Sequence, residues 1–233
     1  MNSTLSKASA TGSIENSAIS LPVKTAFWAG FFYILTFISI PTLYLYQPIH
    51  EPGYLLSSAK DHRVVIGGIL EIIVALSGII TSVILYTVLK KQNQMLSIGL
   101  IAARIVEAGT MFVGVAFLLG AVSLHHQSPA ETNLPIAQTL VAMYDRIFVL
   151  GQGFMPAIDD LLLGVLLYRS RLVPRWLSLV GIIGAFPLFA GYFANMFGVL
   201  DRTSALSGAS ALMVAFFEFT LGCYLLVKGI KRS

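Results

Sequence analysis

The stretch "LIAARIVEAGTMFVGVAFLLG", from Leu100 to Gly120, is almost wholly apolar and long enough to cross a lipid bilayer. It nevertheless carries Arg104 and Glu107 in its first half. A charged side chain at the centre of a membrane helix costs about 2.5–3.5 kcal/mol on insertion scales. Residues three apart on an α-helix are neighbours on its surface, which predicts that Arg104 and Glu107 pair with one another.

The whole chain has the composition of a membrane protein. Of its 233 residues, 56% are hydrophobic and 11% are charged, and the mean hydropathy is +0.81. A soluble domain carries about 25% charged residues, and continuous apolar runs lack the alternation of β-barrel strands. We therefore expect an all-α polytopic membrane protein, a bundle of six transmembrane helices. The predicted spans are Ala26–Tyr46, Val64–Leu89, Met95–Leu124, Ile136–Tyr168, Trp176–Leu200 and Ala205–Val227.

The fourth predicted span is too long for one straight helix. It contains Pro156, which lacks a backbone donor and clashes with the preceding turn, so we expect a kink or break there. The sequence leaves open whether the span is one kinked helix or two segments. The six-helix domain is expected over residues 23–229, between a disordered cytoplasmic tail at 1–22 and a short cytoplasmic tail at 230–233.

The distribution of basic residues predicts how the spans are oriented. With the N-terminus inside, ten Lys and Arg residues flank the spans on the cytoplasmic side and three flank them on the other side. Positive residues are enriched in cytoplasmic loops. We therefore expect both termini to be cytoplasmic (N-in/C-in).

Six acids and two arginines lie within the predicted spans. Asp159 and Asp160 are expected to pair with Arg169 and Arg171 near the cytoplasmic end. The others are either a buried network that fixes helix register or a pocket that binds a small solute or carries protons. The candidates for ligand binding or proton titration are Glu71, Arg104, Glu107, Asp145, Arg146 and Glu218.

Residue spacing predicts which helix faces are buried. Small residues recur at helical spacing around Glu71 and around Glu218. Such stripes let membrane helices approach closely, so both glutamates should point at other helices. Asp145, Gln152 and Asp159 are seven residues apart, which places them on one side of the fourth span unless a kink rotates them. The tyrosines and tryptophans near the span ends, Tyr46 and Tyr54 among them, are expected to form an aromatic belt.

Several kinds of chemistry have no motif in the sequence. It contains no HExxH, GxSxG or Walker-type glycine loop. The single Cys223 and the scattered histidines favour no metal site, and no cofactor and no nucleic-acid partner are predicted. The expected partners are the lipid bilayer and a small-molecule or lipid ligand, and the oligomeric state stays open.

Four motifs in order resemble a bacterial membrane family known as domain of unknown function 4386. These are an arginine (Arg63) opening the second span, "LYTVLKKQNQMLS" as its turn, "ARIVEA" in the third span, and "LLYRSRLVPRWL" between the fourth and fifth. The resemblance covers most of Lys24 to Val227. It implies a multi-pass protein of the bacterial cytoplasmic (inner) membrane without an established activity, and it supplies no catalytic residue. "AIDDLLLG" departs from the expected pattern by placing two acids at Asp159 and Asp160.

Three hypotheses for function follow. The first is binding or transport of a small molecule or ion, with Arg104 anchoring an anionic group and Glu107 or Glu71 titrating. The second is an intramembrane enzyme that acts on a lipid or isoprenoid with the acids as general acid or base. The third is a non-catalytic interaction or immunity-type protein. The sequence favours a non-enzymatic role without deciding it.

Overall fold

The computed structural model describes residues 23–51, 54, 60–125, 127, 130–201 and 204–228. All regular structure in these ranges is helical, and six helices are long and apolar enough to cross a membrane. The predicted all-α six-span architecture is therefore confirmed. The predicted tails, residues 1–22 and 230–233, lie outside the described residues.

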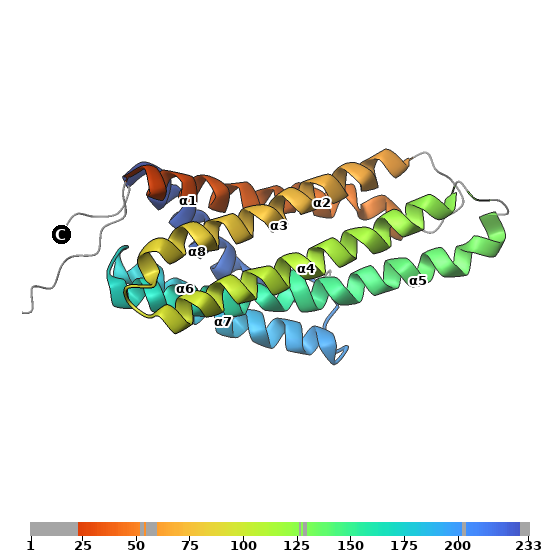
Figure 1. Cartoon of the computed structure of the whole chain (residues 1–233). Helices are drawn as coiled ribbons and strands as arrows, with labels where there is room; N and C mark the ends of the chain where they lie inside the picture. The colour runs from red at the N-terminus through yellow and green to blue at the C-terminus, as the bar shows by residue number, and fades with distance from the viewer. Residues whose placement is uncertain are drawn as a thin grey trace, which may run out of the picture.

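The helices run roughly along the long axis of one bundle (Figure 1). Most of the spans are single α-helices, whereas the first and fourth contain a change of helix type. The elements are α1 (Val23–Leu35), η1 (Thr36–Ile38), α2 (Ser39–Leu45), η2 (Gln47–His50), α3 (Asp61–Leu89), α4 (Gln94–His125), α5 (Ala130–Phe148), η5 (Val149–Phe154), α6 (Met155–Ser170), α7 (Arg175–Met196) and α8 (Ala205–Lys228).

The first span is interrupted near its middle, where the sequence predicted one helix. The interruption is a 3₁₀ segment, η1, and Pro41 follows it in α2. A proline has no N–H to donate to the carbonyl four residues earlier, and its ring crowds that carbonyl. Here that carbonyl belongs to Phe37 in η1, so the missing donor coincides with the change of helix type.

The fourth span changes helix type where the sequence predicted a kink or break. A π-helical segment, η5, joins α5 to α6, and Pro156 is at the start of α6. Pro156 cannot donate to the carbonyl of Gln152, which lies in η5. The span is thus two α-helices joined by a π-helical turn.

The fifth span ends four residues before its predicted end. The α7 helix stops at Met196, and Gly198 follows with a φ of +70°. Glycine adopts this left-handed conformation without steric cost and commonly ends helices. The amide of Gly198 donates to the carbonyl of Asn195 at 3.0 Å, which closes the turn.

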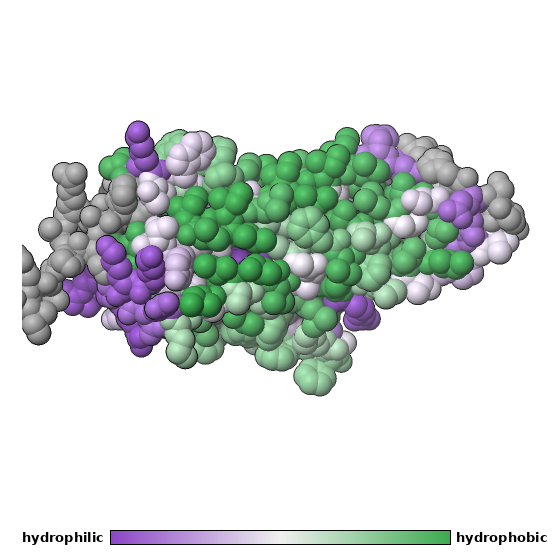
Figure 2. All heavy atoms as spheres, in the orientation of Figure 1, coloured by the Kyte–Doolittle hydropathy of each residue, from purple (hydrophilic) through white to green (hydrophobic). Residues whose placement is uncertain are grey.

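The outer surface of the bundle suits a lipid environment. Large apolar side chains such as Ile69 and Phe216 are exposed around its middle, and Figure 2 shows a broad hydrophobic zone between hydrophilic ends. We name the end that carries the α3–α4 and α6–α7 turns, with Lys90, Lys91 and Arg171, the basic end. The other end carries η2 and the starts of α3 and α5, and we name it the opposite end.

The interior at the basic end is a closely packed apolar cluster. Leu85, Leu100, Leu166 and Leu221 are each at most 2% exposed there. The chains of α1 and α8 approach closely alongside it, because a Cβ added at Gly30 would lie 2.7 Å from the backbone nitrogen of Leu226. Glycine is therefore the residue that allows this pair of helices to touch.

Candidate functional site

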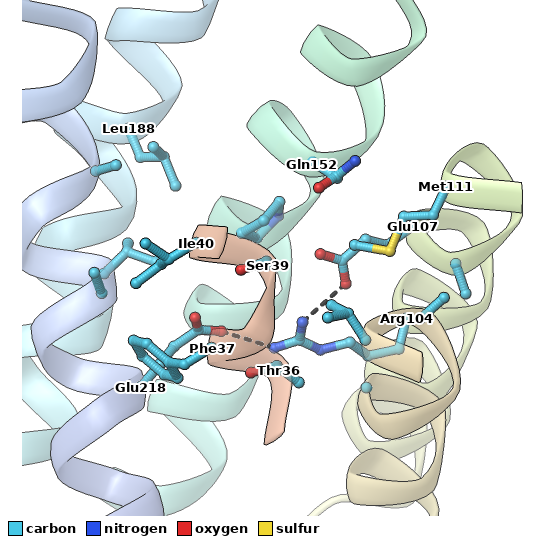
Figure 3. Close-up of a pocket in the computed structure, with 18 of the residues that line it drawn as sticks. Thr36, Phe37, Ser39, Ile40, Arg104, Glu107, Met111, Gln152, Leu188 and Glu218 are labelled. Atoms are coloured by element: carbon cyan, nitrogen blue, oxygen red, sulfur yellow. Dashed lines mark hydrogen bonds and ion pairs between the residues drawn. The ribbon is translucent and has the colours of Figure 1, made fainter. Parts of the chain in front are cut away.

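Arg104 contacts three carboxylates inside the bundle. Its Nη1 donates to Glu107 Oε2 at 2.8 Å, and its Nη2 donates to Glu218 Oε1 at 3.0 Å. Its Nε lies 3.4 Å from Asp159 Oδ2. Figure 3 shows the guanidinium held between Glu107 on α4 and Glu218 on α8. The predicted pair of Arg104 and Glu107 therefore exists, and it is part of a larger ion-pair network that joins α4, α6 and α8.

Two further side chains complete this group. The Tyr33 hydroxyl on α1 donates to Glu218 Oε1 at 3.4 Å, and the Arg104 guanidinium carbon lies 5.9 Å from the centre of the Tyr33 ring. Asp160 is fully buried, and neither of its oxygens accepts a hydrogen bond from any residue that the structure describes. Asp160 follows Asp159 in α6, so it lies beside the acid that pairs with Arg104. We refer to these six residues, Tyr33, Arg104, Glu107, Asp159, Asp160 and Glu218, as the Arg104 cluster.

The position of the two aspartates corrects the sequence-based expectation. Asp159 and Asp160 were expected to pair with Arg169 and Arg171, but they face the bundle interior and Asp159 pairs with Arg104. Ten residues of α-helix span about 15 Å, which separates Asp159 from Arg169 along α6. The seven-residue spacing from Asp145 through Gln152 to Asp159 was the sequence signal for an inward-facing Asp159.

Glu71 is buried away from the cluster and is satisfied by neutral donors. The Tyr46 hydroxyl donates to its Oε2 at 2.6 Å, and the Gln152 side-chain amide donates to its Oε1. As predicted, Glu71 points at other helices. Tyr46 and Tyr54 are buried, so the expectation that they belong to an aromatic belt is wrong.

Asp145 and Arg146 lie near the opposite end of the bundle. Asp145 Oδ1 is 3.0 Å from His50 Nε2 on η2. Arg146 is exposed, and within the described ranges no ion pair joins it to an acid. Of the six predicted candidates, the structure thus brings Arg104, Glu107 and Glu218 together and places the other three elsewhere. Nothing in the spacing along one helix could have revealed the His50 contact.

A polar pair also lies at the opposite end, where Tyr54 precedes α3 and Asp61 is its first residue. Tyr54 donates to Asp61 Oδ1 at 2.7 Å, and burial together with this carboxylate raises the pKa of the Tyr54 hydroxyl well above its ordinary value. Tyr54 therefore stays a hydrogen-bond donor at neutral pH. It packs in an apolar cluster with Ile49 and Val64.

Three members of the Arg104 cluster line a cavity of about 200 Å³, which we name the inner cavity. All six spans contribute to its lining, including η1 and η5, the two irregular segments. Arg104, Glu107 and Glu218 supply its charged wall, and Gln152 supplies a neutral polar group (Figure 3). Phe37, Met111 and Leu188 are among its apolar lining residues.

A second cavity of about 920 Å³, the outer cavity, lies at the opposite end. It is lined by η2, α5, the α7–α8 turn and the start of α8, and it contains His50, Asp145 and Arg146. Tyr192 and Ala211 line both cavities. The two cavities are therefore adjacent along α7 and α8, with the outer cavity nearer the opposite end.

Comparison with known proteins gives a family but no function. Neither the curated proteins nor the solved structures give a match. A family model described as a domain of unknown function (DUF4386) matches residues 28–229, which include every member of the Arg104 cluster. The chain, which has six candidate membrane spans in its described residues, therefore belongs to the DUF4386 family.

Proposed function

We propose that this protein binds a small solute in the inner cavity and carries it across the cytoplasmic membrane of a bacterium. The supporting observation is that the charged wall formed by Arg104, Glu107 and Glu218 lines a cavity that shares Tyr192 and Ala211 with the outer cavity. Ionisable groups within membrane spans are costly and commonly mark solute or proton pathways. A purely structural ion pair would need no cavity beside it.

The packing on either side of the inner cavity is unequal. On the side of the opposite end, the inner cavity adjoins the outer cavity. On the side of the basic end, the apolar cluster begins one helical turn away, with Leu100 one turn from Arg104 and Leu221 one turn from Glu218. In an alternating-access cycle, one side of the solute site is closed by packed side chains while the other side is open. The apolar cluster on one side of the inner cavity and the outer cavity on the other side fit one such state. The distribution of basic residues would make this the state open to the outside.

The helix irregularities also favour transport. In transporters, broken helices occur beside the solute site, where the free backbone groups face a cavity instead of lipid. Pro41 and Pro156 each deprive one carbonyl of its α-helical donor, and those carbonyls belong to Phe37 and Gln152. Both residues line the inner cavity.

The alternative of an enzyme acting on a lipid or isoprenoid would be favoured by Glu71 and Asp145 facing one cavity. Asp145 lines the outer cavity, whereas Glu71 lines neither cavity and has both oxygens occupied by Tyr46 and Gln152. The arrangement therefore supports a solute site more directly than an acid–base pair.

Cysteine labelling tests whether the inner cavity is reached from water. In a chain with Cys223→Ser, we expect Ala215→Cys, on the wall of the inner cavity, to react with membrane-impermeant methanethiosulfonates. The matched control is Phe216→Cys, one residue away on the exposed face of α8, which should stay unreactive in lipid. Cationic and anionic reagents are both used, and reaction with either one supports access. Equal unreactivity at the two positions would reject the proposal.

A further inference from the structure

We infer that the solute of the inner cavity is a small organic cation, a protonated amine with an apolar body, that enters in exchange for a proton. This inference rests on the proposed function and specifies the chemistry of the same site.

The charges of the Arg104 cluster are unbalanced. One arginine contacts three carboxylates, those of Glu107, Asp159 and Glu218, and a fourth acid, Asp160, is buried beside Asp159 in α6. Several net negative charges in a low-dielectric interior are very costly, so protons or a bound cation must neutralise the excess. The titratable members of the cluster come from four helices, α1, α4, α6 and α8. Four of these members carry carboxyl groups, and the other two are Tyr33 and Arg104.

The cluster has little capacity for an anion. All three guanidinium nitrogens of Arg104 already face a carboxylate, at 2.8, 3.0 and 3.4 Å. An anionic solute would have to displace one of these carboxylates and leave it buried without a cation. The hypothesis that Arg104 anchors an anionic group is therefore disfavoured by its own partners.

Two features of the acids favour a cation and an exchangeable proton. Asp160 is buried without a donor among the described residues, next to Asp159 in α6. Neither oxygen of Asp159 accepts a hydrogen bond from the described residues, although Arg104 Nε lies 3.4 Å from its Oδ2. Buried carboxyl groups that lack donors must hold protons or face a cation. A proton held here is available for exchange.

Glu218 is the acid best placed to receive the solute. Its side chain is 17% exposed, compared with 8% for Glu107 and 0% for Asp159. Arg104 and Tyr33 both contact its Oε1, and in the described part of the chain no donor contacts its Oε2. An ammonium group needs carboxylate or carbonyl acceptors of this kind.

The rest of the cavity suits the apolar body of an amine. Phe37, Met111, Tyr192 and Leu188 line it together with small residues of α3 and α8. Aromatic rings attract cations through their π faces. With about 30 Å³ for one water molecule, a cavity of about 200 Å³ has room for a small ring. The binding step balances as R–NH₃⁺ entering and one H⁺ leaving a carboxyl group toward the outer cavity.

Three probes of similar size and different charge test this inference. They are benzylamine, which is cationic at neutral pH, benzyl alcohol, which is neutral, and benzoate, which is anionic. Binding to the full-length protein in lipid nanodiscs is measured by isothermal titration calorimetry in two buffers of different ionisation enthalpy. We expect benzylamine alone to bind, with release of about one proton per bound amine.

Two glutamate variants test whether amine binding depends on the Arg104 cluster. Glu218→Gln keeps the side-chain shape, and we expect it to weaken benzylamine binding about tenfold or more and to reduce proton release. Glu51→Gln, at an exposed glutamate that pairs with Lys60, is the matched control and should bind as the wild type does.

The outcomes distinguish the two proposals. Binding of benzoate or benzyl alcohol without benzylamine would overturn the cation inference and leave a solute site in place. Reaction of Ala215→Cys without binding of benzylamine would likewise overturn only the inference, because the cavity would be accessible but unsuited to amines. Failure of that labelling would remove the proposed function itself.

Discussion

Replacing Arg104 by methionine should destabilise the protein strongly. Arg104 is the cation for carboxylates at 2.8, 3.0 and 3.4 Å, and its side chain is 9% exposed. Removing one partner of a buried ion pair costs about 3–5 kcal/mol, because the remaining charge is left without compensation. Methionine preserves an unbranched apolar stem next to Gly78, whose added Cβ would lie 3.6 Å from Arg104 Cδ. The loss should therefore come from charge and not from a void.

The free energy of unfolding in lipid bicelles is the appropriate measurement. The expected loss for Arg104→Met is about 3–5 kcal/mol. Combining it with Glu218→Gln should restore part of that loss, because one unpaired carboxylate is removed together with the cation. Directly coupled residues show interaction energies of about 0.5–3 kcal/mol in such cycles.

An exposed ion pair provides the control for this experiment. Lys60 Nζ lies 2.6 Å from Glu51 Oε2, and both side chains are about half exposed. Lys60→Met should cost at most about 1 kcal/mol, as exposed pairs do. If Arg104→Met cost no more than Lys60→Met, or if Glu218→Gln gave no rescue, Arg104 would not be the cation that compensates the buried carboxylates.

Three further predictions address the packing, Glu71 and the orientation. Gly30→Ala should lower stability by about 1–3 kcal/mol in the same unfolding assay, because the new methyl group meets the backbone of α8; a neutral effect would contradict the close helix contact. Tyr46→Phe should cost about 1–3 kcal/mol by leaving Glu71 Oε2 without its donor, and an unchanged stability would mean that Glu71 has another donor. A reporter fused after Ser233 should behave as cytoplasmic; periplasmic activity would reverse the proposed orientation.

Hydropathy alone was sufficient to predict the spans. The runs from Val64 to Leu89 and from Met95 to Leu124 lie within α3 and α4 almost end to end. A transmembrane segment must satisfy its own backbone and cover about 30 Å of hydrocarbon, so length and polarity nearly determine its bounds. The end of α7 was less predictable, because Gly198 stops the helix while apolar residues continue beyond it.

The candidate site was predictable only within single helices. The pairing of Arg104 with Glu107 follows from a spacing of three. The contacts of Arg104 with Glu218 and Asp159 join residues on different helices, and no periodicity along one helix encodes the rotation of its neighbour. For the same reason, Glu71 could be assigned to a buried face, but its partners Tyr46 and Gln152 could not be identified.

Protection from labelling shows whether a cation occupies a water-accessible cavity beside the Arg104 cluster. The rate at which an impermeant methanethiosulfonate labels Ala215→Cys is measured with and without benzylamine at ten times its dissociation constant. We predict a rate about tenfold lower with benzylamine, since about nine in ten sites are then occupied, and no change with benzyl alcohol. A labelling rate that benzylamine leaves unchanged would mean that no amine binds beside the Arg104 cluster.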